Sequence, residues 1–179
     1  MHAHLDKILI NQVEIVERSK QLAKEISEKY AKTDKPLILV ALLKGSVPFL
    51  AELMKHMSID IEIDFMDVSS YGTNMESTRD IRILKDLDRS IKEHPIVIVE
   101  DIVDTGRTLQ AVIKILDNKG AQSIEVVSLL DKPSRREVEV DVAYIGFEIP
   151  NEFVVGFGLD FAEKYRELPY IGILHKDFY

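Results

Sequence analysis

The stretch "HPIVIVEDIVDTGRTLQAVIKIL", residues 94–116, decides the fold. Its uninterrupted apolar run, Ile96 to Val99, is typical of a parallel strand that is buried on both faces. The run leads directly into two carboxylates, Glu100 and Asp101, and a third, Asp104, follows three residues later. Ligands of α/β sheets bind beyond the carboxyl ends of the strands, so the acids mark a candidate site.

The turn after these acids has the composition of an anion-binding loop. It leads into a helical pattern over 109–116, and the N–H groups at a helix N-terminus lack partners and carry partial positive charge. Gly106 allows the backbone to approach an anion closely, and Thr105 and Thr108 add hydroxyl donors. The segment has neither the GxxxxGK[ST] pattern of a Walker loop nor the GxGxxG pattern of a dinucleotide loop.

A phosphate beside carboxylates requires hydroxyls or a cation between the negative charges, because like charges repel. A ribose 5′-phosphate meets this requirement. Its phosphate would lie on the turn, and Glu100 and Asp101 would accept hydrogen bonds from the sugar hydroxyls. Mg²⁺ prefers oxygen ligands and can join the same acids. The pattern therefore predicts a sugar-phosphate site.

Alternating strand and helix patterns predict a single α/β domain, residues 1–179, with a largely parallel sheet. Residues 7–30 have helical apolar spacing, and residues 69–80 are polar and are expected to form a loop. Other elements are expected as a helix over 48–57 and as strands over 37–43, 59–68, 81–87, 96–99, 124–130, 142–150 and 153–159.

Composition limits the classes of function. The 179 residues carry a net charge of −8 with a pI of about 5.2, whereas a nucleic-acid-binding surface is usually basic. The chain has no cysteine, which excludes disulfides and thiolate metal sites. Its longest apolar run, Leu37 to Leu43, is too short to span a bilayer, and no signal-peptide pattern is seen. A cytoplasmic protein with neither nucleic-acid nor membrane partners is expected.

The segment "VIVEDIVDTGRTL", residues 97–109, resembles the phosphoribosyl pyrophosphate (PRPP) motif of the type I phosphoribosyltransferases. Further segments are similar to the hypoxanthine-guanine branch of that family, and their order and spacing match over nearly all of the chain. They are "LLKGS" at 42–46, "SSYG" at 69–72, "LLDKP" at 129–133, "EFVVGFGLD" at 152–160 and "EKYRELPY" at 163–170.

The resemblance implies the type I phosphoribosyltransferase fold, a mostly parallel sheet flanked by helices with a small hood region. It implies transfer of the 5-phosphoribosyl group from PRPP to hypoxanthine, guanine or both, with Mg²⁺ as cofactor and release of pyrophosphate. It further implies a homodimer or homotetramer and a non-proline cis peptide bond between Leu43 and Lys44. A mobile loop is implied to begin at Ser70 and Tyr71 and to close over the site.

The resemblance also assigns a contact to each matched residue. It assigns pyrophosphate to Lys44, Gly45 and Arg166; ribose and metal to Glu100 and Asp101; the 5′-phosphate to Asp104, Thr105, Gly106, Arg107 and Thr108; the purine to Lys132, Phe153, Val154 and Asp160, with Asp160 also a metal-linked carboxylate.

Three of these residues are expected to act on the base. Asp104 would be the catalytic residue, exchanging a proton with N7 of the purine. Lys132 would donate to O6, which favours a 6-oxopurine over adenine. Phe153 would offer a stacking face.

Two other functions share parts of this pattern. A pyrimidine attenuation protein that binds RNA has the same fold and PRPP motif, but it has an aromatic residue at the position of Asp104 and needs a basic face. Phosphoribosyltransferases for orotate, uracil or adenine more often carry "TGG" and lack the pair of Asp104 and Lys132. Arg135 and Arg136 are expected to form a solvated face or a subunit contact.

Overall fold

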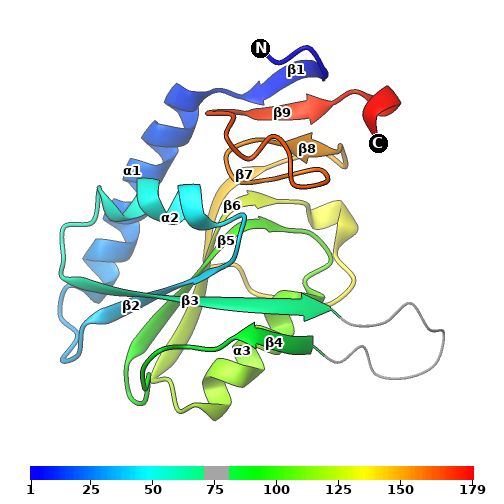
Figure 1. The fold of residues 1–179 in the computed structure, drawn as a ribbon. Helices are drawn as coiled ribbons and strands as arrows, with labels where there is room; N and C mark the ends of the chain where they lie inside the picture. The colour runs from blue at the N-terminus through cyan, green and yellow to red at the C-terminus, as the bar shows by residue number, and fades with distance from the viewer. Residues whose placement is uncertain (71–80) are drawn as a thin grey trace.

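A computed structural model of the chain describes residues 1–70 and 81–179 (Figure 1). Its central sheet has the order β4-β3-β2-β5-β6-β7, and only the β3–β4 pair is antiparallel. A smaller antiparallel sheet has the order β1-β9-β8. The helices and strands are β1 Leu5–Ile10, α1 Gln12–Tyr30, β2 Leu37–Leu42, α2 Val47–Met54, β3 Ile61–Ser70, β4 Ile81–Lys85, β5 Pro95–Val103, α3 Arg107–Asn118, β6 Ser123–Asp131, β7 Tyr144–Glu148, β8 Val154–Val155 and β9 Ile171–Leu174.

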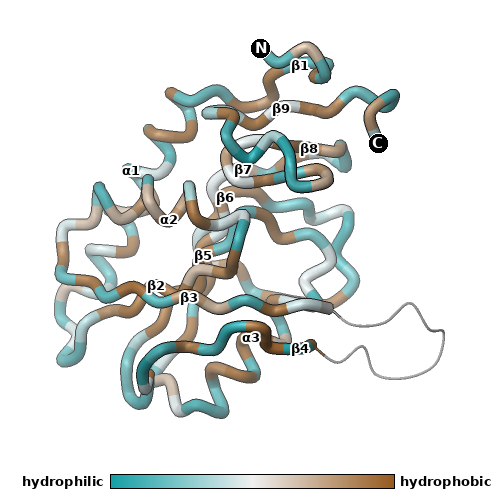
Figure 2. Tube along the Cα trace, viewed as in Figure 1, coloured by the Kyte–Doolittle hydropathy of each residue, from teal (hydrophilic) through white to brown (hydrophobic). Residues whose placement is uncertain are grey.

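Helices cover both faces of the central sheet, as the buried strands require (Figure 1). All six residues of β2 are buried, and alternate residues face opposite sides. Leu39 packs in the cluster formed with α1 and α2, whereas Val40 packs in the cluster formed with α3. Figure 2 shows the resulting apolar strands at the centre of the molecule. The predicted α/β class with a mostly parallel sheet is confirmed.

The prediction of helix from residue 7 onward was wrong for the first residues. Leu5–Ile10 form β1, because they pair with β9 at the other end of the chain. Helix α1 begins only after Asn11, whose side chain accepts hydrogen bonds from the N–H groups of Val13 and Glu14 at 2.9 and 3.1 Å. Strand β9 was not predicted, since its four residues form a strand only through long-range pairing.

Three predicted strand boundaries also need correction. Strand β5 continues to Val103, so Glu100 and Asp101 lie within the strand rather than at its end. Strand β3 continues through Ser70, which was expected in a loop, because it pairs with Ile81 of β4. In the segment 153–159 only the two residues of β8 form a strand. Tyr71 and the rest of the expected mobile loop, 71–80, lie outside the described residues.

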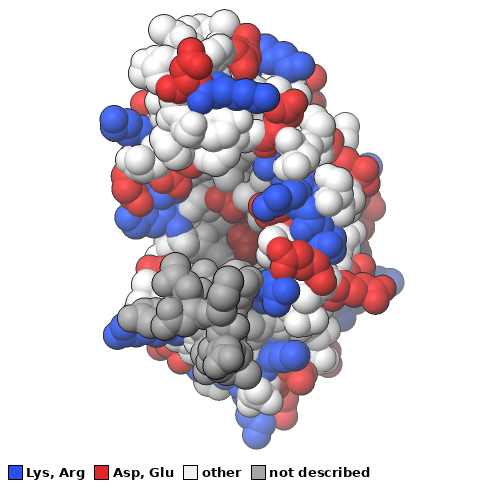
Figure 3. All heavy atoms as spheres, turned by 90° about the vertical axis from the view of Figure 1, so that its right-hand side faces the viewer, with Lys and Arg blue, Asp and Glu red and all other residues white. Residues whose placement is uncertain are grey.

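The small sheet forms a hood above the carboxyl ends of the central strands (Figure 1). It combines residues 5–10 with 154–155 and 171–174, from opposite ends of the chain. Seen from the side to which the central strands point, the molecule is hollowed, with acidic atoms at the floor and basic atoms on the rims (Figure 3). Within the described residues, no helix is long and apolar enough to cross a membrane.

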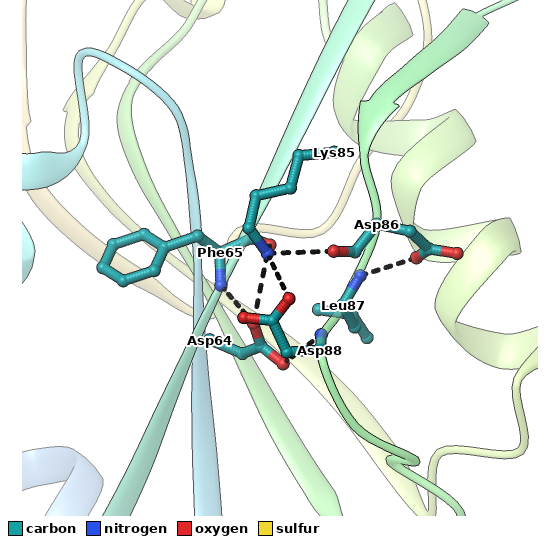
Figure 4. A network of polar contacts seen from close by, with 6 residues as sticks. All are labelled: Asp64, Phe65, Lys85, Asp86, Leu87 and Asp88. Atoms are coloured by element: carbon teal, nitrogen blue, oxygen red, sulfur yellow. Dashed lines mark hydrogen bonds and ion pairs between the residues drawn. The ribbon is translucent and has the colours of Figure 1, made fainter.

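A buried carboxylate, that of Asp64, ties β3 to β4 and to the segment that follows it. The side chain of Asp64 is 3% exposed, and its oxygens accept hydrogen bonds from the N–H groups of Phe65 at 2.7 Å and Asp88 at 3.0 Å. The ammonium of Lys85 lies 3.7 Å from the same carboxylate. It also donates to the backbone oxygens of Phe65 and Asp86 and to the carboxylate of Asp88 (Figure 4).

We expect Lys85→Met to lower the free energy of unfolding by about 2–4 kcal/mol, because it leaves the buried carboxylate of Asp64 without its cation. Lys24→Met is the control, since its ammonium is exposed and lies 3.8 Å from exposed Glu28; an exposed pair contributes roughly 0–1 kcal/mol. Urea unfolding of both variants measures the difference. If both variants lose the same free energy of unfolding, the ion pair of Lys85 with buried Asp64 contributes no more than an exposed ion pair.

Candidate active site

The turn between β5 and α3 encloses a cavity of about 120 Å³, lined by residues of 100–109. Gly106 is the N-cap of α3 and has φ of 83°, a left-handed conformation that glycine adopts without strain. In the described part of the chain, the N–H groups of Thr105 and Gly106 donate to no protein acceptor. The turn therefore has the size, the unpaired donors and the helix N-terminus that the phosphate site requires.

Glu100 and Asp101 project from β5 beside this turn, and neither acid has an ion-pair partner within 4 Å among the described residues. Burial, and then the neighbouring charge of Asp101, hold the pKa of Glu100 well above its ordinary range. Burial raises the pKa of Asp101 to about 6, although the more distant charge of Arg166 opposes the shift. Such desolvated acids are suited to accept hydrogen bonds from sugar hydroxyls or to meet a cation.

Two glycines bring the hood, the loop after β2 and strand β5 into contact. A side chain at Gly45 would collide with the carboxylate of Asp101, and one at Gly158 would collide with the backbone oxygen of Gly45. The expected cis peptide bond between Leu43 and Lys44 is present immediately before this contact. The loop after β2 therefore lies directly between the acids of β5 and the hood.

The cations expected to bind pyrophosphate face one another across this contact. Lys44 extends from the loop after β2, and its ammonium lies 3.1 Å from Glu163 of the hood. The guanidinium of Arg166 contacts Asp160 at 3.0 Å and Glu163 at 3.3 Å and donates to the backbone oxygen of Gly158. Its buried Nε has no hydrogen-bond partner among residues 1–70 and 81–179. Glu163 was not singled out from the sequence, where it is one acid among several in a polar segment.

The residues assigned to the purine lie where the hood meets β6. Lys132 is 8% exposed and donates to the backbone oxygen of Glu152 at 2.7 Å. Burial lowers its pKa, while the charge of Asp104 opposes that shift. The ring of Phe153 stacks on Tyr179 with centroids 4.6 Å apart, and Val154 is buried in β8. The hood thus supplies an aromatic surface beside a buried lysine.

The expectation that Arg135 and Arg136 form a solvated face was wrong for Arg136. Its side chain is 18% exposed, donates to the backbone oxygen of Asp104 at 2.8 Å and pairs with Asp131. Arg135 is half-exposed and lies 3.2 Å from the carboxylate of Asp104. Their contacts with Asp104 join residues 31 and 32 positions apart, which periodicity along the chain does not reveal.

The chain matches the family described as "Phosphoribosyl transferase domain" over residues 7–162. It therefore belongs to the phosphoribosyltransferase family. The hypoxanthine phosphoribosyltransferase of Escherichia coli K12 is 48% identical over 169 residues, 94% of this chain and 95% of that protein. The hypoxanthine-guanine phosphoribosyltransferase of Streptococcus mutans is 45% identical over 179 residues, 100% of this chain and 98% of that protein. Within the family, the chain belongs to the hypoxanthine-guanine branch.

A solved structure of hypoxanthine phosphoribosyltransferase from Staphylococcus aureus has a TM-score of 0.94 and 44% identity, covering 100% of this chain and 96% of that chain. The type I phosphoribosyltransferase fold is thereby confirmed. The chain is also 45% identical, over its whole length, to the bifunctional protein TilS/HprT of Listeria monocytogenes, but it spans only 27% of that relative.

Asp101→Asn should raise the stability of the ligand-free protein at neutral pH. The pKa of Asp101 rises from 3.8 unfolded to about 6 folded, so the folded protein binds the extra proton between these values. Stability therefore falls as pH rises through this window and stays reduced above it. Asparagine avoids this loss, which is on the order of 1–3 kcal/mol. Thermal unfolding between pH 4 and 8 measures it.

Asp34→Asn, at an exposed position, is the control for that comparison. The advantage of Asp101→Asn over the wild type should be full above pH 6 and should vanish below about pH 4. An advantage of equal size at both ends of the range would contradict burial of the charge as its cause.

Proposed function

We propose that this chain is a purine salvage enzyme that transfers the 5-phosphoribosyl group of PRPP to hypoxanthine or guanine, giving IMP or GMP and pyrophosphate. The observation that carries the proposal is one hollow holding a phosphate-sized turn, two buried acids and the cations of Lys44 and Arg166. Membership of the hypoxanthine-guanine branch supports this reaction over both RNA binding and transfer to orotate, uracil or adenine.

PRPP would lie across the carboxyl ends of β2 and β5. Its 5′-phosphate would bind the turn of residues 104–108, including the side chains of Thr105, Arg107 and Thr108 and the backbone of Gly106. The ribose hydroxyls would donate to Glu100 and Asp101. This placement is supported by the free N–H groups of the turn and by the raised pKa values of the two acids.

The pyrophosphate would lie between Lys44, the backbone N–H near Gly45, and Arg166. Glu163 contacts both cations in the ligand-free chain, so a pyrophosphate oxygen would replace its carboxylate there. Cations at this position stabilise the negative charge that develops as the pyrophosphate leaves. The buried, unpaired Nε of Arg166 supports a further ligand at this side chain.

The purine would stack on Phe153, with its edge against the hood. Lys132 would donate to O6, and backbone atoms near Val154 and Asp160 would contact C2 and its substituent. Asp104 would exchange a proton with N7 of the five-membered ring while N9 of the same ring bonds to C1 of the ribose, from which the pyrophosphate leaves. The charge of Asp104 acts on the pKa of Lys132 against the effect of burial, which supports a shared role of the two side chains at one base.

Mg²⁺ is the proposed cofactor, held by Glu100, Asp101 and Asp160 together with substrate oxygens. The three carboxylates are the hard oxygen donors that this ion prefers. Among residues 1–70 and 81–179, no three acidic or histidine side chains are arranged to hold a metal by themselves. Substrate oxygens would therefore complete the coordination, and the bound ion would neutralise charge on the pyrophosphate.

Residues 1–179 would form one phosphoribosyltransferase domain that assembles into a homodimer or homotetramer in the cytoplasm. The loop beginning at Ser70 and Tyr71 would close over the bound substrates.

A panel of bases tests the proposed function. With PRPP and Mg²⁺, hypoxanthine and guanine should be converted to nucleotides with release of pyrophosphate, whereas adenine, orotate and uracil should not. Adenine carries a donor at position 6, and two facing donors exclude it. Exhaustive chelation should abolish turnover, and added Mg²⁺ should restore it. Turnover of adenine at a comparable rate, or undiminished turnover after chelation, would refute the corresponding part of the proposal.

Asp104→Asn should lower kcat by on the order of 10²-fold or more, because asparagine keeps the shape but cannot carry the proton. The Kd for PRPP should change much less, since the backbone of the turn holds the phosphate. Steady-state kinetics and calorimetric titration with PRPP separate the two effects. If PRPP binding is lost together with kcat, Asp104 supports the turn instead of transferring a proton.

A further inference from the structure

The segment that follows β6 covers the outer side of the phosphate turn. The N–H groups of Glu137 and Val138 both donate to the backbone oxygen of Thr105, at 3.0 and 3.2 Å. A side chain at Gly106 would meet atoms of Arg136, Val138 and Val140 at 3.0–3.1 Å. The turn therefore lies between this segment on one side and the cavity on the other.

Within this contact, the side chain of Arg136 joins the ends of two neighbouring strands. One nitrogen of its guanidinium donates to the backbone oxygen of Asp104 at 2.8 Å, just after β5, and another pairs with Asp131 at the end of β6. The side chain of Asp131 is 6% exposed. Its backbone pairs with Val103 and accepts a hydrogen bond from Ile149 at 2.9 Å. The carboxylate that anchors Arg136 is thus itself fixed by the sheet.

The hydrogen bonds to the C=O groups of Asp104 and Thr105 also orient the N–H donors of the turn. In a planar trans peptide, the C=O of one residue and the N–H of the next point in opposite directions. The C=O of Asp104 is held by Arg136, so the N–H of Thr105 is turned away from Arg136. The C=O of Thr105 is held by residues 137 and 138, so the N–H of Gly106 is turned away from them. Both N–H groups lack protein acceptors among the described residues.

We propose that the Asp131–Arg136 pair is a positioning device for PRPP, which aims the peptide N–H groups of Thr105 and Gly106 at the 5′-phosphate. Arg136 touches no reacting atom and acts through the backbone of Asp104. The proposal rests on the proposed function only in naming PRPP as the ligand. Its chemistry, a phosphate bound by two oriented peptide donors, also applies to ribose 5-phosphate, which can be measured without turnover.

The test compares four variants: Arg136→Gln, Arg136→Lys, Asp131→Asn and the double variant Asp131→Asn/Arg136→Gln. Arg136→Gln should raise the KM for PRPP and the Kd for ribose 5-phosphate on the order of tenfold, the effect of one lost charge-assisted hydrogen bond. The KM for hypoxanthine should be unchanged, and kcat should fall less than the KM for PRPP rises. Arg136→Lys should recover part of the loss, since one ammonium can hold the carbonyl of Asp104.

The double variant separates positioning from stability. It leaves no unpaired buried charge, so it should unfold at a higher temperature than Arg136→Gln alone. The proposal nevertheless requires its KM for PRPP to be as high as that of Arg136→Gln, because the carbonyl of Asp104 is unheld in both. If the double variant recovers both the unfolding temperature and the KM, the pair is structural only and the proposal is overturned.

Arg135→Gln is the charge-matched control. It removes the same charge next to the turn, from a half-exposed side chain that contacts the carboxylate of Asp104 and not its carbonyl. Its KM for PRPP should change less than about threefold. If the KM for PRPP rises equally in Arg135→Gln and Arg136→Gln, the effect comes from the loss of charge, and the proposal is overturned. Calorimetry with ribose 5-phosphate gives the same comparison even if the wild type shows no purine turnover, which would refute the proposed function alone.

Discussion

The parallel pairing of β5 with β2 and β6 is the constraint on which the rest of the molecule depends. It places the carboxyl ends of three strands at one edge, and each strand supplies a different part of the site there. The loop after β2 brings Lys44, the turn after β5 brings the phosphate donors, and the segment after β6 brings Lys132. Because all three strands are buried, these starting points are fixed relative to one another by the core.

The distribution of charge follows from the need to bind a highly charged anion beside acids. Glu100 is buried and Asp101 is partly buried in the strand, and desolvation raises the pKa of each. The cations proposed to face the pyrophosphate, Lys44 and Arg166, come instead from a loop and from the hood, and Glu163 contacts both of them. In that position the hydrogen bond from Lys44, and then the charges of Lys44 and Arg166, lower the pKa of Glu163. The two acids of β5 and the cations of Lys44 and Arg166 therefore come from separate elements.

The local parts of this design could be predicted from the sequence, because neighbouring residues determine them. Strand, turn and helix between residues 95 and 118 follow from an apolar run, a glycine and a helical spacing. The hood could not be predicted in the same way, since β1 and β9 become strands by pairing across more than 160 residues. The contact of Arg136 with Asp104 was missed for the same reason, because nothing in the local sequence shows that Arg136 reaches the carbonyl of a residue 32 positions earlier.

The glycines show how closely the parts must approach one another. Gly158 of the hood lies against the backbone of Gly45, and Gly45 lies against the carboxylate of Asp101, so no side chain fits at either contact. A larger residue at either position would separate the hood from the strand that carries the acids. The cations of Lys44 and Arg166 would then move away from Glu100 and Asp101, although none of these four residues had changed. The distance between the charges is therefore set by the close contacts at the two glycines, and the charged side chains add the chemistry to this frame.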